Sequence, residues 1–432
     1  MPDGSASTPI KVLDIELTRP LAALSGLDGY AAAQGLVRAG GVPVGMVHVP
    51  LESGGCSSEA LRSAVLHQLG RELAAHEVSL QDTPDRGPRH ELSAGRVPSQ
   101  DAAWPSITVA VCTRNRPADL ATCLDSVCAL DYPRLDVLVV DNAPSDDATA
   151  ALLPTRYPDF RYVREPRPGL NWARNRALVD AAGEIIAYTD DDVVVDRGWA
   201  RAIGAAFANA PADVMVVTGL VVPFELETEV QLQFERYGGF TSGFDREELR
   251  GGPDWGTRGV WHLAGMAQRF TGANMAFRRE VFDEIGPFDP ALGAGTPTNG
   301  GDDSEMLFRV LRGGFAIAYE PAAVVRHRHR REYDQLVRQI SGWGTGYAAF
   351  LTRSALAHPS ASLVYLLLGL CGLGHQLGRL AASVFRPPGF PRRLLRVEAA
   401  GMLAGPVRYW RARRKAAAIA RAFEREVAGV SS

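Results

Sequence analysis

Residues 183–199, GEIIAYTDDDVVVDRGW, run an apolar strand directly into three consecutive carboxylates, Asp190, Asp191 and Asp192. Like charges a few ångströms apart disfavour full ionisation, so such a cluster is unfavourable unless a cation lies nearby. Asp is also a common turn former where strands end, and a solvated turn is the competing interpretation. The surrounding sequence has to decide between a turn and a cation site.

Short apolar runs alternate with helical patterns on both sides of this stretch. Runs typical of strands that are covered on both faces occur at residues 107–113, 136–142, 161–165, 184–190 and 214–222. Residues 117–130 and 171–183 carry helical patterns between them. This alternation predicts an α/β fold with an open, mostly parallel sheet flanked by helices.

Polar residues follow three of the predicted strands. Thr113 and Arg114 follow the first, Asp141 ends the second, and the three carboxylates end a later one. Ligands of open α/β sheets bind beyond the carboxyl ends of the strands. We therefore expect these side chains to converge on one crevice, which favours a binding site over independent turns.

Composition is that of an ordinary globular protein. The chain has 432 residues, more than one core usually supports, so two or three domains are expected. Hydrophobic residues make up 46% and charged residues 22% of the chain. The formal net charge of −3 gives no basic excess, so we expect no nucleic acid partner.

Four ordered segments within residues 107–329 resemble family 2 glycosyltransferases, the inverting enzymes with the nucleotide-sugar-binding GT-A fold. They are VAVCTRNRPADLATCLDSVCALDYPRLDVLVVDN, GLNWARNRALVDAAGEIIAYTDDD, FTGANMAFRREVFDEIGPFDPAL and GGDDSEMLFRVLRGGFAIAYEPAAVVRH. The resemblance implies metal-dependent transfer of a sugar from a nucleoside-diphosphate sugar to an acceptor hydroxyl, in glycan, cell-envelope or glycolipid synthesis. The chain departs from the family at Cys112, where Pro is frequent, and at Pro144, where Ser is common, which leaves the nucleotide open.

The same resemblance implies that Asp190 and Asp192 form a D-x-D pair that binds Mg²⁺ or Mn²⁺, with Asp192 the direct ligand and Asp191 structural. A hard divalent ion prefers oxygen ligands and is often held by one or two carboxylates, which leaves positions for substrate phosphates. His327 is implied near the metal or diphosphate, and His329 is a weaker candidate. Four arginines beside them either attract diphosphate or form a solvated basic loop: Arg326, Arg328, Arg330 and Arg331.

For the donor nucleotide, the resemblance implies that Asp141 accepts hydrogen bonds from the base. Thr113 and Arg114 would line the nucleotide pocket, with Asp190 beside them, and Arg174 would approach the nucleotide. The planar fork of Arg suits phosphate oxygens and base edges. The alternative for Arg174 is a solvated helix residue.

An acceptor hydroxyl must lose its proton as it attacks, so a carboxylate is needed as general base. The resemblance assigns that role to Asp303, with Asp302 the next candidate. The alternative for these acids is stabilisation of a helix N-terminus. Asn274 is expected to position sugar hydroxyls.

We predict four parts of the chain. Residues 1–81 form a small N-terminal α/β accessory domain with strands at 10–17 and 42–51, a helical pattern at 28–40 and a helix at 57–76. A linker rich in Pro, Gly and charge follows at residues 82–104. The catalytic domain spans residues 105–335, and a helical, basic C-terminal extension spans residues 336–432.

The C-terminal extension raises a membrane question. Residues 358–385 are apolar but borderline for a span, which needs about 20 apolar residues. The basic residues that follow favour docking on an anionic membrane surface over a span, which would carry them across the bilayer. A buried helix on the catalytic domain is the other alternative.

Five scattered cysteines without a CxxC pair are typical of a reducing compartment, and residues 1–17 lack the features of a secretory signal. We expect a cytoplasmic protein, peripheral on the inner face of the cell membrane, with a glycan, lipid-linked or small-molecule acceptor. Two rivals remain: a non-catalytic nucleotide- or glycan-binding protein of the same fold, and a sugar nucleotidyltransferase. The latter needs a Gly-rich phosphate loop after the first strand, and CTRNRPADL contains no glycine.

Overall fold

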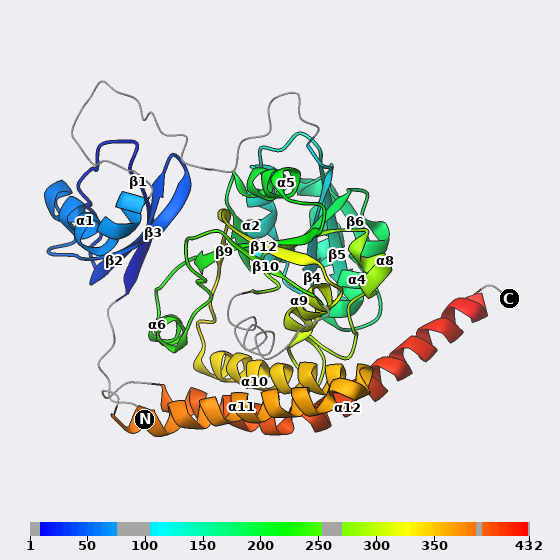
Figure 1. Ribbon diagram of the computed structural model, residues 1–432. Coiled ribbons are helices and arrows are strands. Elements are labelled where there is room, and N and C mark those ends of the chain that lie inside the picture. The colour runs from blue at the N-terminus through cyan, green and yellow to red at the C-terminus, as the bar shows by residue number, and fades with distance from the viewer. Residues whose placement is uncertain (1–8, 76–103, 253–269, 386–390, 431–432) are drawn as a thin grey trace.

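The computed structural model describes residues 9–75, 104–252, 270–385 and 391–430 (Figure 1). The predicted linker over residues 82–104 lies outside the described residues except for Trp104.

The N-terminal part is a three-stranded sheet covered by one helix. Strand β2 (Ala32–Ala39) is central, parallel to β1 (Ile10–Glu16) and antiparallel to β3 (Val42–Pro50). Helix α1 (Ser58–Ala75) buries Leu61, Val65, Leu69 and Leu73, which are spaced to lie on one side of the helix.

The helix predicted over residues 28–40 is wrong, because its core is strand β2. Most of β2 is buried, and a Cβ on Gly35 would lie 2.3 Å from Cδ1 of Ile15. A central strand needs small residues at such close approaches. Pairing on both edges therefore overrides the helical preference of its alanines.

The central part is built on a mixed sheet of nine strands among the described residues. The spatial order is β10-β12-β9-β11-β7-β4-β5-β6, and β8 also pairs with β12. In chain order the strands are β4 (Ile107–Thr113), β5 (Leu135–Asn142), β6 (Arg161–Glu165), β7 (Ile185–Asp190), β8 (Val193–Val195), β9 (Val214–Pro223), β10 (Glu247–Arg250), β11 (Met275–Arg278) and β12 (Ala316–His327).

The predicted α/β fold with flanking helices is confirmed, and all five predicted strands of this part are present. Strands β7, β4, β5 and β6 are parallel, as expected. Strands β9 and β12 run in the same direction, so the predicted mostly parallel sheet is confirmed. The exceptions are β11, which lies antiparallel between β7 and β9, and β8 and β10, which are antiparallel to β12. These three strands are only three or four residues long, which is too short for a sequence pattern to predict them.

Alternate residues of the buried strands enter two cores on opposite faces of the sheet. Ala110 and Cys112 of β4 face one core, and Val109 and Val111 face the other. The first core includes α4 (Leu170–Asp180), α8 (Val281–Ile285) and α9 (Asp302–Arg312). The second includes α2 (Pro117–Cys128), α3 (Ala148–Arg156) and α5 (Trp199–Asn209). This two-sided burial explains why these strands are apolar without alternation.

The N-terminal sheet packs against the central sheet. Leu36 of β2 belongs to one apolar cluster with Val222 of β9 and Val324 of β12. The Arg38 guanidinium, which is buried, forms ion pairs with Asp14 and with Asp196 of the central part.

The predicted helical C-terminal extension is confirmed as three helices, α10 (Tyr333–Ala357), α11 (Ser362–Ala382) and α12 (Arg392–Val430). Figure 1 shows them side by side along the lower edge of the central part, with the end of α12 projecting beyond it. The short helix α6 (Glu229–Tyr237) joins them through an apolar cluster that contains Phe234, Leu336 and Leu394.

Helix α10 lies directly against the loop that begins α9. A Cβ added to Gly346 would lie 2.5 Å from both Gly300 C and Gly301 N. Backbone atoms cannot move away as a flexible side chain can, so this approach requires glycine. The contact fixes the N-terminal end of α9 relative to the C-terminal helices.

We expect Gly346→Ala to lower the free energy of unfolding by about 1–3 kcal/mol, because overpacking forces backbone shifts. Thermal unfolding by circular dichroism would measure the loss. Gly378→Ala is the matched control, since Gly378 of α11 has no atom within 4 Å of its added Cβ and Ala favours helices. Equal unfolding temperatures for the two variants would contradict the prediction.

Candidate functional site

A cavity of about 320 Å³ lies at the carboxyl ends of strands β4 and β7. Parallel strands end at the same edge of a sheet, so the polar residues that follow them meet there. The residues that line it are Cys112, Thr113, Arg114, Arg116, Asn142, Gly169, Leu170, Asp190, Asp191, Asp192, Ala294, Gly295, His327 and Arg330. The structure thus brings together Thr113, Arg114, the three carboxylates and His327.

Asp190, Asp192 and His327 form a group that could hold a metal ion, since one ligand atom from each lies within 4.8 Å of the others. His327 reaches this group from the end of β12, whereas the two acids come from the end of β7 and the turn after it. Nε2 of His327 is 3.4 Å from Oδ1 of Asp192. Two carboxylate oxygens and an imidazole nitrogen are a suitable donor set for a divalent cation.

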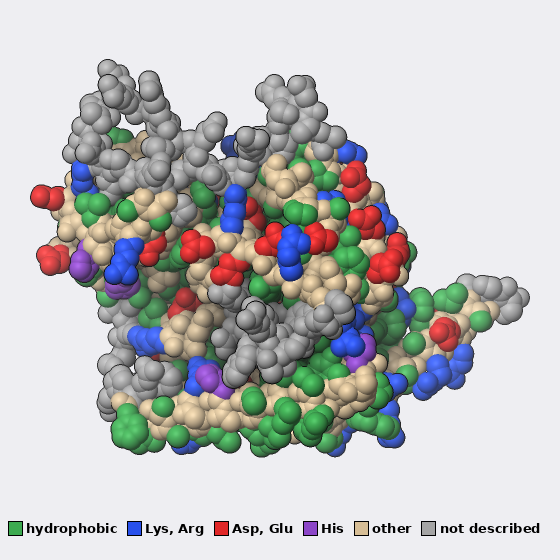
Figure 2. Space-filling view, in the orientation of Figure 1, with side chains coloured by type: hydrophobic (Ala, Val, Ile, Leu, Met, Phe, Trp, Pro, Cys, Tyr) green, Lys and Arg blue, Asp and Glu red, His purple; other side chains and the backbone are tan. Residues whose placement is uncertain are grey.

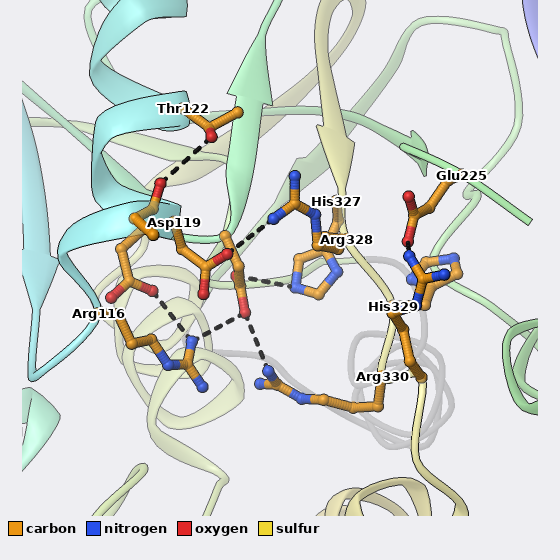
Figure 3. A network of polar contacts seen from close by, with 12 residues as sticks. Arg116, Asp119, Thr122, Glu225, His327, Arg328, His329 and Arg330 are labelled. Carbon is orange, nitrogen blue, oxygen red and sulfur yellow. Dashed lines mark hydrogen bonds and ion pairs between the residues drawn. The ribbon is translucent and has the colours of Figure 1, made fainter. Parts of the chain in front are cut away.

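Asp192 accepts hydrogen bonds from two arginines. Its Oδ2 accepts from Nη1 of Arg116 at 3.1 Å and from Nη1 of Arg330 at 3.2 Å. Figure 3 shows Arg116 and Arg330 approaching from different elements, α2 and the segment after β12. Burial raises the pKa of Asp192, but His327, Arg330 and Arg116 outweigh burial and lower it below its usual value. Asp192 is therefore ionised.

The two neighbouring carboxylates differ from Asp192. Burial, with smaller contributions from the charges of Asp192 and Asp191, raises the pKa of Asp190 to about 7. Burial and then Asp192 raise the pKa of Asp191 to about 6. Asp191 accepts from Oγ1 of Thr113 at 2.8 Å and from Arg116 at 3.1 Å, so it joins β4 to the turn after β7. A bound cation would favour the ionised form of both acids.

His327 is buried and its Nδ1 has no hydrogen-bond partner among the described residues. Burial lowers its pKa to about 4, so the imidazole is neutral near pH 7 and can offer a lone pair. His329 differs, because its Nε2 lies 2.8 Å from Glu235 and its ring packs against Phe234. His329 does not line the cavity.

The four arginines around these histidines have separate partners. Arg326 pairs with Asp14 and Arg331 pairs with Glu225. Arg328 donates to Asp119 in the first turn of α2, 2.7 Å away (Figure 3). Arg330 alone among the four lines the cavity.

Sequence reasoning missed Arg116, which holds both Asp191 and Asp192. It stands at the N-cap of α2, three residues beyond strand β4. Its place directly before Pro117, where a helix was predicted to begin, is the signal that could have found it.

Asp141 is fully buried at the end of β5 and does not line the cavity above. Its Oδ2 accepts from the Tyr162 hydroxyl at 2.9 Å, whereas Oδ1 has no partner in the described structure. Burial raises the pKa of Asp141. Leaving a buried acceptor unpaired costs free energy, so a ligand donor at this oxygen would be stabilising.

The two acids at the start of α9 are held by different groups. Asp302 forms an ion pair with Arg174, and Nη2 of Arg174 is 4.0 Å from Asp190. Arg174 is buried, which excludes the alternative of a solvated helix residue, but its guanidinium faces acids and does not line the cavity. It links the acids of α9 to those that follow β7.

Asp303 accepts hydrogen bonds from two backbone amides. The Gly272 N–H donates to Oδ2 at 3.0 Å, and the Ser304 N–H donates to Oδ1 at 2.7 Å. Burial and then the neighbouring Asp302 raise the pKa of Asp303. A carboxyl group with a raised pKa is a stronger base than an ordinary aspartate.

Asn274 does not line the cavity, contrary to the expectation that it positions sugar hydroxyls. Its Nδ2 donates to the carbonyl oxygens of Leu220 and Ala323, and its Oδ1 accepts from Nε1 of Trp199. The side-chain amide of Asn274 therefore already has partners within the protein at both its nitrogen and its oxygen. In this structure Asn274 joins β9, β12 and α5.

The α/β sheet and the acid pair at the end of β7 agree with the architecture that the sequence resemblance leads us to expect. Residues 108–286 match the family described as Glycosyl transferase family 2. Over these residues the chain is similar to that family.

Two curated relatives illustrate the similarity. The pre-mycofactocin glycosyltransferase of Mycobacterium tuberculosis (strain ATCC 25618 / H37Rv) is 26% identical over 338 residues, which is 75% of this chain and 62% of the relative. The succinoglycan biosynthesis protein ExoM of Rhizobium meliloti (strain 1021) is 30% identical over 233 residues, 51% of this chain and 65% of the relative. The matches thus span less than two thirds of the length of either relative.

A similar solved structure is the mannosyltransferase PcManGT from Pyrobaculum calidifontis in complex with GDP-Man and Mn²⁺. It has a TM-score of 0.46 and 19% identity, with coverage of 70% of this chain and 87% of that chain.

Proposed function

We propose that this chain transfers a sugar from a nucleoside-diphosphate sugar to an acceptor hydroxyl, with inversion at the anomeric carbon and with the help of a divalent metal ion. The observation that carries the proposal is the meeting of Asp190, Asp192 and His327 at one cavity, with Arg174 linking this group to the acids of α9. The match of residues 108–286 to the glycosyl transferase family 2 model supports the same activity.

The donor set fits a metal ion. The oxygens of Asp190 and Asp192 and the neutral ring of His327 would hold Mg²⁺ or Mn²⁺. When bound, the ion supplies positive charge that stabilises the departing nucleoside diphosphate.

The protein's own cations support the diphosphate. Arg116 and Arg330 line the cavity on either side of Asp192, where their N–H groups can also donate to phosphate oxygens. Thr113 and Arg114 line the nucleotide part of the cavity in this proposal, and the free Oδ1 of Asp141 accepts from the base.

Asp303 acts as the general base. As the acceptor oxygen forms its bond to the anomeric carbon, the bond from that carbon to the diphosphate oxygen breaks, and the acceptor proton moves to Asp303. One displacement inverts the anomeric centre. The amides of Gly272 and Ser304 fix the carboxylate, and Arg174 fixes Asp302 beside it.

We also propose the setting. The five free cysteines suit a reducing compartment, so we place the reaction in the cytoplasm, and a lipid-linked or glycan acceptor of cell-envelope synthesis would bring it to the inner face of the membrane. We propose residues 105–335 as the catalytic domain, with residues 1–81 as an accessory domain.

The test is to incubate the protein with a panel of nucleoside-diphosphate sugars and Mn²⁺, with candidate acceptors, and to identify the phosphate product. Release of nucleoside diphosphate that depends on metal and acceptor supports the proposal. A separate assay supplies a nucleoside triphosphate and a sugar 1-phosphate. Release of pyrophosphate in that assay would indicate a nucleotidyltransferase instead. Tight donor binding without any product, over the whole panel, would favour a binding protein.

We predict that Asp141→Asn weakens nucleoside diphosphate binding by about tenfold, because it alters the buried acceptor that a nucleobase N–H would satisfy. Isothermal titration calorimetry with the preferred nucleotide measures the change. Asp136→Asn is the control, since Asp136 lies on the same strand but pairs with Arg161 and Thr108. Equal loss in both variants would contradict a specific contact at Asp141.

A further inference from the structure

One side of α11 is apolar and exposed. The helical spacing of five leucines places them on one side of α11, with exposed fractions between 49% and 66%: Leu363, Leu366, Leu367, Leu370 and Leu377. Residues 359–385 have a mean hydropathy of 1.4 over their most apolar window, of which 17% is buried. A core helix of a soluble protein would be mostly buried, so burial within this chain does not explain the composition.

The opposite side of α11 is fixed to the protein by polar contacts. Nε2 of Gln376 donates to the Tyr237 hydroxyl at 2.9 Å and to Glu398 of α12 at 2.5 Å. Arg379 donates to the Tyr237 carbonyl oxygen at 3.2 Å. A membrane-spanning α11 would break these contacts and place Gln376 and Arg379 in hydrocarbon, which is costly. The geometry therefore favours a helix that lies along a surface.

Helix α12 adds a second exposed apolar row. Leu403, Val407 and Trp410 are spaced four and three residues apart and are more than half exposed. Arg411 and Arg414 follow them, and the Arg414 guanidinium lies 4.4 Å from the Trp410 ring centre. Figure 2 shows hydrophobic side chains along the lower edge of the molecule, where Figure 1 places α11 and α12, with Lys and Arg side chains beside them.

We propose that this membrane face, made of the exposed leucines of α11 with Leu403, Val407 and Trp410 of α12, docks on an anionic lipid bilayer with α11 parallel to its surface. Residues 392–430 carry ten Lys or Arg and three Glu, which complements the negative charge of such a bilayer. Trp side chains are favourable at the level of the lipid head groups. Two copies packed through this face would bring their basic helices together, which like charge disfavours.

The inference is tested with the full chain by sedimentation with vesicles of phosphatidylcholine alone or of phosphatidylcholine with phosphatidylglycerol. We expect binding to the anionic vesicles that weakens with salt, and little binding to the neutral ones. The double variant Leu366→Glu with Leu370→Glu should bind at least about tenfold more weakly, because two leucines that would enter the bilayer become negatively charged. The control is Leu66→Glu on α1, since Leu66 is also exposed, at 47%, but lies outside the membrane face.

A second pair, Arg411→Gln with Arg414→Gln, should reduce binding to anionic vesicles and flatten its salt dependence. Unchanged circular dichroism melting shows that each variant is folded. Equal binding of the leucine variant and the wild type would overturn the proposal. So would self-association without vesicles that the leucine variant abolishes, which would assign the face to a second copy, or resistance to alkaline extraction from membranes, which would indicate a span. None of these results depends on sugar transfer.

Discussion

Replacing Asp303 with Asn is expected to lower the rate of sugar transfer by about 10²–10⁴-fold and to leave donor binding intact. The amide keeps the size of the carboxylate, and its oxygen can still accept from the Gly272 N–H, but it cannot take the acceptor proton. Single-turnover transfer with the donor identified in the product assay measures the first effect. Calorimetric titration with the same donor measures the second.

Asp302→Asn is the matched comparison, because Asp302 is the next candidate for the base. Its carboxylate neutralises the buried Arg174, so its loss should lower thermal stability and disturb the group around Asp190. Full transfer activity in Asp303→Asn, with loss in Asp302→Asn, would move the role of base to Asp302.

The acid limb of the transfer rate offers a further check on the same assignment. Transfer needs ionised Asp303, and burial together with Asp302 raises the pKa of that carboxyl. The rate should therefore fall as the pH drops through a value above that of an ordinary aspartate. In Asp303→Asn the small remaining rate should lose that dependence.

That several candidate site residues converge on one cavity could be predicted from the sequence, because apolar runs indicate where strands end. Thr113, Arg114, Asp190, Asp192 and His327 do line one cavity. The ion pairs between these side chains could not be predicted from the sequence, because a contact such as that of Arg116 with Asp192 depends on how α2 packs against the sheet. A residue between a strand and a helix gives no sign of which carboxylate it will reach.

Close packing explains the other differences. Residues 32–39 have the composition of a helix, but they form a central strand because they pair with β1 on one side and β3 on the other. Gly35 leaves the space that the Ile15 side chain occupies. Asn274 matched a family position, but its amide joins strands of the core. In both cases tertiary contacts far apart in the chain decide the outcome, and local pattern carries no information about them.

Asp192→Ala is expected to abolish the dependence of donor binding on metal and to lower transfer by at least about 10²-fold. Loss of a ligand weakens the ion that stabilises the leaving diphosphate, an effect of several kcal/mol, and each 1.36 kcal/mol corresponds to tenfold in rate. Arg116 and Arg330 also lose their shared partner, so the cavity keeps positive charge that can still attract phosphate weakly.

The measurement is donor affinity with Mn²⁺ and with chelator, for wild type and variant. Chelator should weaken donor binding to the wild type and have no effect on Asp192→Ala, whose affinity should match the chelated wild type. Asp119→Ala is the control, because Asp119 pairs with Arg328 in the same network but does not line the cavity. Since Asp119 offers nothing to the metal group, this control should keep the full metal response. A wild type whose donor affinity is the same with and without chelator would show that the acids after β7 serve Arg116 and Arg330 rather than a metal ion.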